Sequence, residues 1–234
     1  FRRVLFRSVQ DKVGADPTGL PFNSVIALEL HGGKPLSPLV NAGAIATTSL
    51  INAENTEQRW QRILHIQQQL AGEQVALSDE VNQSEQTTNF HNRAIAWLLY
   101  SAGYLYCDAM EACDVYTRQC STLINTIELA TLGATLAAGG VNPLTHKRVL
   151  QADNVPYILA EMMMEGLYGR SGDWAYRVGL PGKSGVGGGI LAVVPGVMGI
   201  AAFSPPLDEE GNSVRGQKMV ASVAKQLGYN VFKG

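Results

Sequence analysis

A glycine-rich segment near the carboxyl end constrains the fold of this chain more than any other stretch. Residues 179–190 read GLPGKSGVGGGI and lead directly into the apolar residues 191–194. The glycines at 185 and 187–189 let backbone N–H groups approach a ligand more closely than residues with side chains allow. The segment therefore predicts either a glycine-rich hairpin or a strand whose backbone lines a binding site.

The triplet Gly182-Lys183-Ser184 matches the end of a phosphate-binding loop, but the rest of that pattern is missing. The pattern needs a glycine five residues before Gly182, and residue 177 is arginine. It also needs a helix after the serine, whereas glycines and a β-like apolar run follow here. The remaining interpretation is an active-site strand similar to the Lys-Thr-Gly strand of penicillin-recognising serine hydrolases.

Composition excludes several classes of protein. The 234 residues are 46% apolar and 16% charged, which predicts one large globular domain or two packed lobes. The net charge is −2 and no run of 18 apolar residues occurs, so neither a nucleic acid nor a membrane is a predicted partner. Cys107, Cys113 and Cys120 form no disulfide framework or zinc-binding pair, and the four histidines are scattered. We expect a cytoplasmic protein without a metal site.

The order of predicted elements indicates an α+β protein, with a helical middle followed by antiparallel strands and a closing helix. Residues 1–8 are interpreted as foreign and residues 9–234 as a partial domain, helical from about 41 to 170 and sheet-forming from about 171 to 234. Periodicity predicts helices at 41–52, 56–71, 89–104, 108–119, 124–138, 152–166 and 215–229, and strands at 174–178, 182–186, 190–194 and 197–203. Asn41 is expected to cap the first of these helices. Residues 78–88 are predicted to be a polar connector and 205–212 a turn.

A serine hydrolase with a Lys-Ser-Gly strand needs a Ser-x-x-Lys helix, in which the amine activates the hydroxyl. The sequence holds one clean match, Ser222 to Lys225, in the last predicted helix. The apolar positions of that helix share one face: Met219, Val220, Val223 and Leu227. Ser222 and Lys225 lie on the opposite face, toward solvent, so we do not expect this pair to be catalytic.

A series of segments from about residue 9 onward resembles bacterial glutaminases of the serine-dependent family, which is related to β-lactamases. The segments are FNSV at 22–25, NAGAI at 41–45, SE at 84–85, NR at 92–93, YTRQCS at 116–121, AAGG at 137–140, GLYGRSG at 166–172, the stretch 179–189, and SPPLD at 204–208. The resemblance implies a β-lactamase/DD-peptidase-like fold, with a helical subdomain and an antiparallel sheet flanked by helices. The family's first strands and nucleophile helix would lie upstream of the residues present.

The resemblance implies hydrolysis of L-glutamine to L-glutamate and ammonia through an acyl-serine intermediate, without a cofactor. The family positions that hold glutamine correspond to Asn41, Glu85, Asn92, Tyr116, Tyr168 and the Val186 backbone. Substrate chemistry agrees, because the Glu85 carboxylate suits an α-ammonium group and asparagine amides suit an α-carboxylate. Without the resemblance, Glu85 is interpreted as a solvated surface acid.

The same resemblance assigns roles near the reacting centre. Tyr116 and Tyr168 would lie beside the nucleophile, where a phenol can transfer or orient a proton. The N–H of Val186 would stabilise an oxyanion, with Lys183 as a supporting charge next to Ser184. Since the Ser-x-x-Lys helix is not found, we expect the chain as given to be inactive by itself.

Two alternatives to a glutaminase remain open at this stage. A penicillin-binding protein or β-lactamase should carry Ser-Asp-Asn where this chain has Tyr-Thr-Arg-Gln at 116–119. A non-catalytic remnant that binds an amino acid is the other alternative. The resemblance also implies a homo-oligomer, without fixing the number of subunits.

Overall fold

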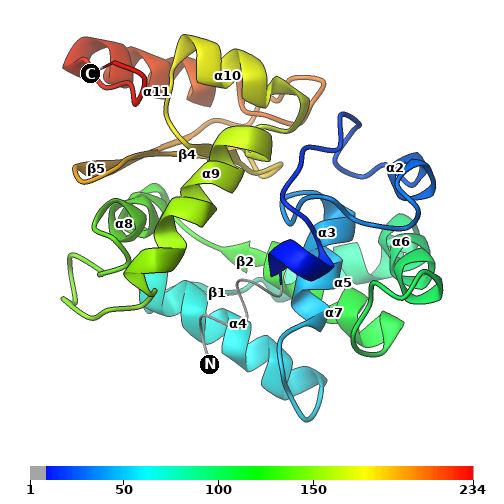
Figure 1. Ribbon diagram of the computed structural model, residues 1–234. Helices are drawn as coiled ribbons and strands as arrows, with labels where there is room; N and C mark the ends of the chain where they lie inside the picture. Colours follow the sequence, from blue (N-terminus) through cyan, green and yellow to red (C-terminus); the bar gives the residue numbers. More distant parts are fainter. Residues whose placement is uncertain (1–8, 234) are drawn as a thin grey trace. The chain divides into compact units, whose positions relative to one another are not determined.

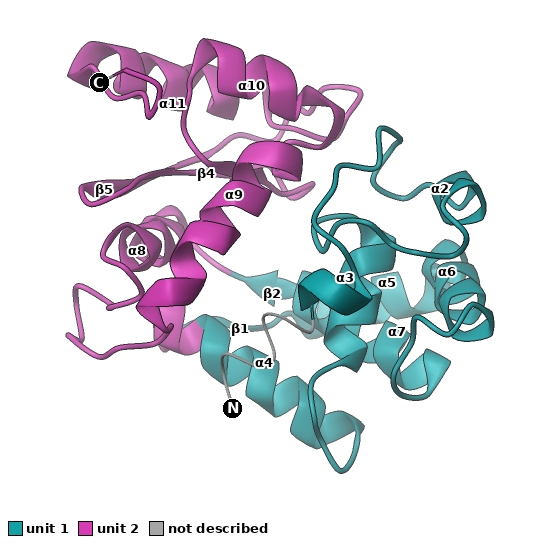
Figure 2. Cartoon of the chain, viewed as in Figure 1, with its two compact units in different colours: residues 1–67, 74–123 teal, residues 68–73, 124–234 magenta. Residues whose placement is uncertain are grey.

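The computed structural model describes residues 9–233, which form two compact units (Figures 1 and 2). Within these residues, unit 1 comprises 9–67 and 74–123, and unit 2 comprises 68–73 and 124–233. The interpretation of residues 1–8 as foreign falls outside the described residues. Both units mix helices with short antiparallel strands, which confirms the predicted α+β class. No helix in 9–233 is long and apolar enough to cross a membrane.

Unit 1 is mainly helical. Its elements are α2 (Ile26–Leu30), α3 (Asn41–Ser49), α4 (Thr56–Ala71), β1 (Ala76–Leu77), α5 (Asp79–Thr88), α6 (Phe90–Ser101), α7 (Ala109–Cys120) and β2 (Thr122–Leu123). The two short strands pair antiparallel, with Ala76 opposite Leu123. The predicted helix at 56–71 has the bounds of α4, because Trp60 and Ile63 recur on one face and pack against Val115 of α7.

The core of unit 1 forms where α3, α6 and α7 pack together. Ile45 of α3 and Ile95 and Leu99 of α6 are completely buried there. The small residues at the start of α3 let the preceding segment at Ser37 lie directly against the helix, since a Cβ at Gly43 would lie 1.7 Å from the Ser37 carbonyl oxygen. This packing positions the first residue of α3 against the other two helices.

The prediction of a polar connector at 78–88 is wrong, because residues 79–88 form α5. Ser78 caps this helix, its side chain accepting a hydrogen bond from Val81 N, and Asp79 and Glu80 occupy the first turn. A capping serine and acidic residues both stabilise a helix N-terminus. None of the residues in α5 is buried, so the apolar periodicity that reveals other helices is missing.

Unit 2 is built on a three-stranded sheet. Its elements are α8 (Thr126–Ala137), η1 (Ala152–Asn154), α9 (Val155–Glu165), η2 (Tyr168–Arg170), α10 (Ser171–Arg177), β3 (Gly182–Ser184), β4 (Gly189–Val194), β5 (Met198–Phe203) and α11 (Val214–Leu227). The strands follow the order β3-β4-β5 and pair antiparallel, with Lys183 opposite Leu191 and Leu191 opposite Ala201. The glycine-rich segment is therefore the β3–β4 hairpin.

Both faces of this sheet are covered, as Figure 1 shows for α8 and α11. Ile190 and Ala192 of β4 pack in one cluster with Val220 of α11. Leu191 and Val193 pack in another with residues of α8 and α9. Because successive strand residues point to opposite faces, double coverage explains why β4 is apolar throughout instead of alternating.

Two glycines allow α8 to lie directly on β5. A Cβ at Gly199 would lie 2.4 Å from the Ala130 carbonyl oxygen and 2.5 Å from Ala134 N. A Cβ at Gly133 would lie 2.9 Å from Gly199 Cα. Backbone therefore meets backbone at this helix–sheet contact, and neither position has room for a side chain.

Residues 174–178 were predicted as a strand, which is wrong, because 171–177 form α10. Trp174 is buried, and its indole N–H donates to the Leu180 carbonyl oxygen at 2.7 Å. Asp173 and Arg177 form an ion pair one helical turn apart, at 2.8 Å. Trp174, one of the aromatic residues that favour a strand, instead anchors a short helix to the chain that follows, whereas Tyr176 is exposed.

The last helix buries a different line of residues from the predicted one. Val220 and Ala224 of α11 are 1% and 2% exposed, whereas Met219, Val223 and Leu227 are 45%, 38% and 54% exposed. The buried line thus runs along the i, i+4 row through Ala224. Ser222 and Lys225 are exposed, as the sequence predicts.

Candidate active site

Three of the predicted site residues in unit 1 form one hydrogen-bonded chain. The Tyr116 hydroxyl, on α7, donates to Asn41 Oδ1 at 3.1 Å. Asn41 Nδ2, at the start of α3, donates to Asn92 Oδ1 on α6 at 2.9 Å. The chain therefore joins the three helices that share the core of unit 1.

The side chain of Asn41 does not cap its helix, contrary to the prediction. Val40 is the N-cap residue of α3, and no side-chain cap hydrogen bond is made there. The backbone N–H of Asn41 donates instead to the Phe22 carbonyl oxygen at 2.9 Å. Both ends of the Asn41 amide are consequently engaged with Tyr116 and Asn92.

The donor-to-acceptor direction of these hydrogen bonds determines which group of Asn92 remains available to a ligand. Asn92 Oδ1 accepts from Asn41, so the Asn92 amide has its NH₂ group left to donate. In the part of the chain that the structure describes, no hydrogen bond from Asn92 Nδ2 to a protein acceptor is made, and Asn92 is half-buried. An amide held in this way is suited to bind a carboxylate.

Glu85 lies on a separate helix from Asn92, so their seven-residue spacing does not place them on one helical face. Asn89 ends α5 and begins α6, with a ψ of 33° that breaks the helix. Asn89 Nδ2 donates to Thr117 Oγ1 at 2.9 Å, and Gln86 Nε2 donates to Asp114 Oδ1 at 2.7 Å. These two bonds fix the carboxyl-terminal end of α5 against α7.

The Glu85 side chain is exposed. Among residues 9–233, no hydrogen bond joins it to Asn41, Asn92 or Tyr116. Its neighbour Gln86 is anchored, as is Arg93, whose guanidinium donates to the Gln86 carbonyl oxygen at 2.7 Å. The backbone that carries Glu85 is therefore held in place, and its carboxylate is accessible to a cationic ligand.

In unit 2, Lys183 of β3 meets Tyr168 of η2. Lys183 Nζ donates to the Tyr168 phenol oxygen at 3.2 Å and to the Ser184 carbonyl oxygen at 2.5 Å. The ammonium also lies 4.3 Å from the centre of the Tyr168 ring. A phenol oxygen that accepts from Lys183 directs its own proton away from that ammonium.

Ser184, predicted as a supporting residue, is buried, with 4% of its surface exposed. Its N–H and its hydroxyl both donate to the Gly166 carbonyl oxygen, at 3.0 and 3.3 Å. This double contact attaches the residues before Tyr168 to β3. Ser184 thus holds backbone in place and has no room to act as a nucleophile.

Val186 lies at the tip of the β3–β4 hairpin. Gly185 N donates to Gly189 O and Gly188 N donates to Gly185 O, each at 2.9 Å, which closes a tight turn. The N–H of Val186 makes no hydrogen bond within the described residues, and the residue is 58% exposed. The turn therefore presents an unpaired backbone donor at Val186.

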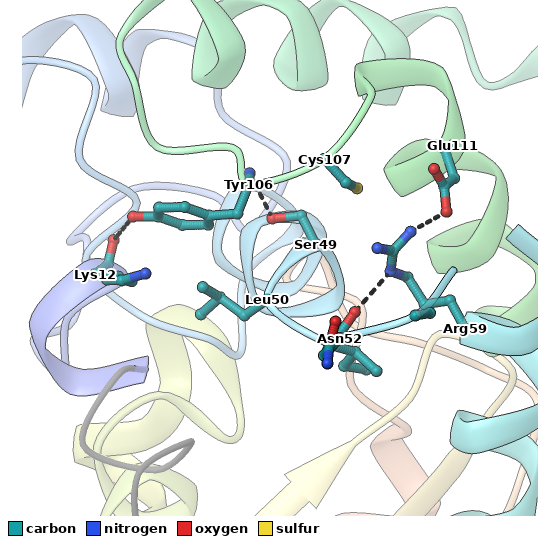
Figure 3. A pocket seen from close by; sticks show the side chains of 10 residues that line it. Lys12, Ser49, Leu50, Asn52, Arg59, Tyr106, Cys107 and Glu111 are labelled. Carbon is teal, nitrogen blue, oxygen red and sulfur yellow. Dashed lines mark hydrogen bonds and ion pairs between the residues drawn. The ribbon is translucent and has the colours of Figure 1, made fainter. Parts of the chain in front are cut away.

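A pocket of about 390 Å³ in unit 1 contains none of the predicted site residues (Figure 3). Figure 3 shows Arg59 paired with Glu111 on its wall, and Arg59 Nε donates to the Ile51 carbonyl oxygen at 3.0 Å. Cys107 also lines it, and burial raises the pKa of that thiol to about 11. Because Arg59 is already paired and the Cys107 thiol is protonated, we interpret this pocket as structural.

Sequence reasoning missed two buried polar residues in unit 2, Asn212 and Ser213, each 0% exposed. Asn212 ends the predicted turn at 205–212 and Ser213 follows it, and only the tertiary fold buries them. Within residues 9–233, no group of three or more histidine, cysteine, aspartate or glutamate side chains could hold a metal ion.

Comparison with known proteins identifies the family. A family model described as "Glutaminase" matches residues 2–232. The chain belongs to the glutaminase family. Glutaminases are amidohydrolases, and the solved ones similar to this chain have the β-lactamase-like α+β fold that the resemblance implies.

Individual glutaminases agree with this assignment. "Glutaminase 1" of Escherichia coli O6:H1 is 99% identical over 228 residues, which are 97% of this chain and 74% of that protein. A solved "Probable glutaminase" at 97% identity has a TM-score of 0.97 and covers 97% of this chain and 74% of its own. A covalent complex of a Bacillus subtilis glutaminase with 5-oxo-L-norleucine, 31% identical, has a TM-score of 0.86, with 97% and 74% covered.

Proposed function

We propose that this chain carries the substrate-recognition and oxyanion residues of an enzyme that hydrolyses L-glutamine to L-glutamate and ammonia through an acyl-serine intermediate. The observation that carries the proposal is the hydrogen-bonded chain from Tyr116 through Asn41 to Asn92. The series of hydrogen bonds ends at the NH₂ group of the Asn92 amide, which is fixed in direction and open to a carboxylate.

Unit 1 recognises the amino-acid end of the substrate. The NH₂ group of Asn92 donates to the α-carboxylate of glutamine, and Asn41 holds that amide in the donating orientation. The exposed carboxylate of Glu85 pairs with the α-ammonium group. Tyr116 fixes Asn41 and, by resemblance to the family, also lies near the nucleophile.

Unit 2 acts on the side-chain amide. The unpaired N–H of Val186 donates to the oxyanion that forms when the amide carbonyl is attacked. The phenol of Tyr168 transfers a proton to or from the reacting groups, with its oxygen held by Lys183. Lys183 thereby supports the reaction through its charge and is not itself the general base.

A covalent nucleophile, which the acyl-enzyme step needs, is supported by the Bacillus subtilis relative. That protein reacted with 6-diazo-5-oxo-L-norleucine to give a covalent 5-oxo-L-norleucine complex. This reagent has its ketone at the position of the side-chain amide carbonyl of glutamine. Loss of N₂ leaves the nucleophile bound to the adjacent carbon, so the adduct marks a nucleophile beside that carbonyl.

The described residues offer one Ser-x-x-Lys pair, Ser222 and Lys225, and both are exposed on α11. The Ser222 hydroxyl accepts from Gln226 Nε2 at 2.9 Å, and no buried environment activates it. We therefore expect residues 1–234 by themselves to bind amino acids without hydrolysing glutamine.

The test compares residues 1–234 with the full-length Escherichia coli O6:H1 relative, by ammonia release from glutamine and by calorimetric titration with glutamate. We expect ammonia release by the relative and binding alone by residues 1–234. Ser222→Ala in the relative should leave its rate unchanged. Ammonia release by residues 1–234 that disappears with Ser222→Ala would overturn the assignment of the nucleophile. Hydrolysis of the β-lactam nitrocefin in place of glutamine would favour the penicillin-binding alternative.

We also propose that the protein is a cytoplasmic homo-oligomer. Cys107, Cys113 and Cys120 are all outside disulfides, as is typical of a reducing compartment. Phe90, Trp97 and Tyr100 of α6 are 68%, 51% and 55% exposed, which is typical of a surface that another subunit covers. Light scattering after size-exclusion chromatography tests the oligomer, and a monomeric mass at micromolar concentration would contradict it.

A further inference from the structure

Asn212, in the loop between β5 and α11, is a fully buried polar residue that the proposed mechanism does not use. Its side-chain Nδ2 donates to the Leu167 carbonyl oxygen at 3.2 Å. Its own backbone is held on both sides, because its N–H donates to Asp208 Oδ1 at 2.9 Å and its carbonyl oxygen accepts from Asp208 N at 2.8 Å. The amide of Asn212 is therefore a fixed donor aimed at the residue before Tyr168.

The two residues before Tyr168 are held from three directions. Asn212 binds the Leu167 carbonyl oxygen, and the Ser171 hydroxyl accepts from Leu167 N at 2.9 Å. The Gly166 carbonyl oxygen accepts from Ser184 of β3. Leu167 itself is completely buried in the core of unit 2. The peptide that leads into Tyr168 consequently has little freedom to rotate.

Tyr168 needs this restraint because its backbone is strained. Its φ is +54°, in the left-handed region that residues with a Cβ rarely adopt. Such a conformation persists only where the surrounding structure enforces it, and it is frequent at functional sites. With the backbone in this conformation, the phenol oxygen lies 3.2 Å from Lys183 Nζ.

The same loop also holds the hairpin that carries Val186. The Ser213 hydroxyl donates to the Ser204 carbonyl oxygen at 2.7 Å. Ser204 N in turn donates to the Gly188 carbonyl oxygen at 2.9 Å, two residues after Val186. Asn212 and Ser213 are adjacent in the chain. This buried pair therefore connects to the segments that carry the Tyr168 phenol and the Val186 N–H, the two groups proposed to act on the glutamine amide.

We propose that Asn212 is a positioning residue for glutamine hydrolysis. Its hydrogen bond to the Leu167 carbonyl oxygen holds Tyr168 in the left-handed conformation, which keeps the phenol against Lys183. This inference rests on the proposed function, which assigns the proton transfer to Tyr168. Loss of Asn212 should lower kcat through Tyr168, whereas a purely structural asparagine would affect stability alone.

Asn142 provides a matched control in the same unit. It is 2% exposed, its Nδ2 donates to the Gln69 carbonyl oxygen at 2.9 Å, and its Oδ1 accepts from Leu144 N at 2.9 Å. None of these partners is a proposed site residue. Asn142→Ala therefore removes a buried asparagine with comparable hydrogen bonds from a position that the mechanism does not involve.

The test measures kcat and KM for glutamine in the full-length Escherichia coli O6:H1 relative, with the substitutions made at the aligned positions. Asn212→Ala should lower kcat about 10- to 100-fold and change KM less than about threefold, since the amino-acid end of the substrate binds elsewhere. Asn142→Ala should leave kcat within about twofold. In a Tyr168→Phe background, Asn212→Ala should cost less than about threefold more, because both changes remove the same positioned phenol.

Two outcomes would overturn the inference while leaving the proposed function intact. One is a kcat of Asn212→Ala equal to that of Asn142→Ala. The other is a full multiplicative loss in the double variant with Tyr168→Phe. Should Asn212→Ala fail to fold, Ser171→Ala removes the other side-chain partner of Leu167 and is expected to lower kcat about three- to tenfold. A wild-type enzyme that releases no ammonia from glutamine would overturn the proposed function and this inference together.

Discussion

The phenol of Tyr116 donates a hydrogen bond to Asn41 Oδ1, although 75 residues separate them in the chain. This bond determines which end of the Asn41 amide faces Asn92, since Oδ1 is occupied and only Nδ2 can reach Asn92 Oδ1. A single hydroxyl on α7 thus sets the direction of two amides on α3 and α6. The proposed recognition of an α-carboxylate depends on that direction.

Asn92→Asp should raise the KM for glutamine about 10- to 100-fold, because a carboxylate would replace the donor that faces the substrate carboxylate. Steady-state ammonia release by the full-length relative measures this change. Asn82→Asp makes the same replacement on α5, where the side chain only accepts a bond from Gln86 Nε2 at 3.4 Å. It should leave KM within about twofold. Equal effects of the two variants would contradict the proposed role of Asn92.

Arg59→Ala should destabilise unit 1 by about 3–5 kcal/mol, because it leaves the Glu111 carboxylate without its cation. The side chains of Arg59 and Glu111 are 5% and 21% exposed, so water replaces the lost partner poorly. Urea unfolding measures the loss. The apolar pair Arg59→Met with Glu111→Leu should recover most of the stability. A double variant as unstable as Arg59→Ala would show that the pair contributes more than mutual neutralisation.

Gly166→Ala should destabilise the protein by about 3 kcal/mol or more, because its Cβ would lie 1.7 Å from the Gly182 carbonyl oxygen. Gly182 begins β3 and Gly166 lies two residues before Tyr168, so glutamine hydrolysis should fall as well. Gly172→Ala is the control, since a Cβ there would meet nothing within 4 Å and α10 should gain up to about 1 kcal/mol. Thermal unfolding compares the two. A stable Gly166→Ala protein would contradict the packing at this contact.

The three cysteines should react with iodoacetamide in a defined order. Cys120 is exposed and should react first at neutral pH. Burial raises the pKa of Cys107 to about 11 from 9.0, so only about one part in a thousand is thiolate at pH 8. Its labelling should keep rising up to about pH 11, whereas an unperturbed thiol would level off above pH 9. Cys113, 2% exposed and with its pKa also raised by burial, should react only on unfolding.

Peptide mapping by mass spectrometry assigns the label to each cysteine. Rapid labelling of Cys107 at pH 7 would contradict the raised pKa. Labelling of Cys113 at the same rate as Cys120 would instead indicate that the core of unit 1 opens easily.

Much of the fold could be predicted from local pattern. Helix α4 was predicted with its observed bounds, and β4 and β5 within a residue at each end, because each carries a strong apolar signal. The errors fall where that signal is weak. In α5 no residue is buried, and α10 depends on one indole that binds a carbonyl six residues later. Capping in α5 and a tertiary contact in α10 stabilise the helical conformation of those segments.

The site was predictable only in part. The residue types agreed with glutamine chemistry, but the bond between Asn41 and Asn92 spans 51 residues and no spacing rule reveals it. Asn41 was expected to cap its helix, as asparagine before a helix often does. Asn212 lies at the end of the predicted turn at 205–212, and its burial comes from distant parts of unit 2. Sequence alone contains no signal for that burial.

The contact between Gly133 of α8 and Gly199 of β5 has a practical consequence for genetics. Since any side chain at either position would meet backbone atoms at 2.9 Å or less, no compensating change at the partner can make space. In a saturation library, both codons should therefore drop out for every replacement, whether selection is for abundance or for growth on glutamine. The pair offers a built-in reference for loss of folding, against which the depletion of Asn92 or Tyr168 variants can be recognised as loss of chemistry.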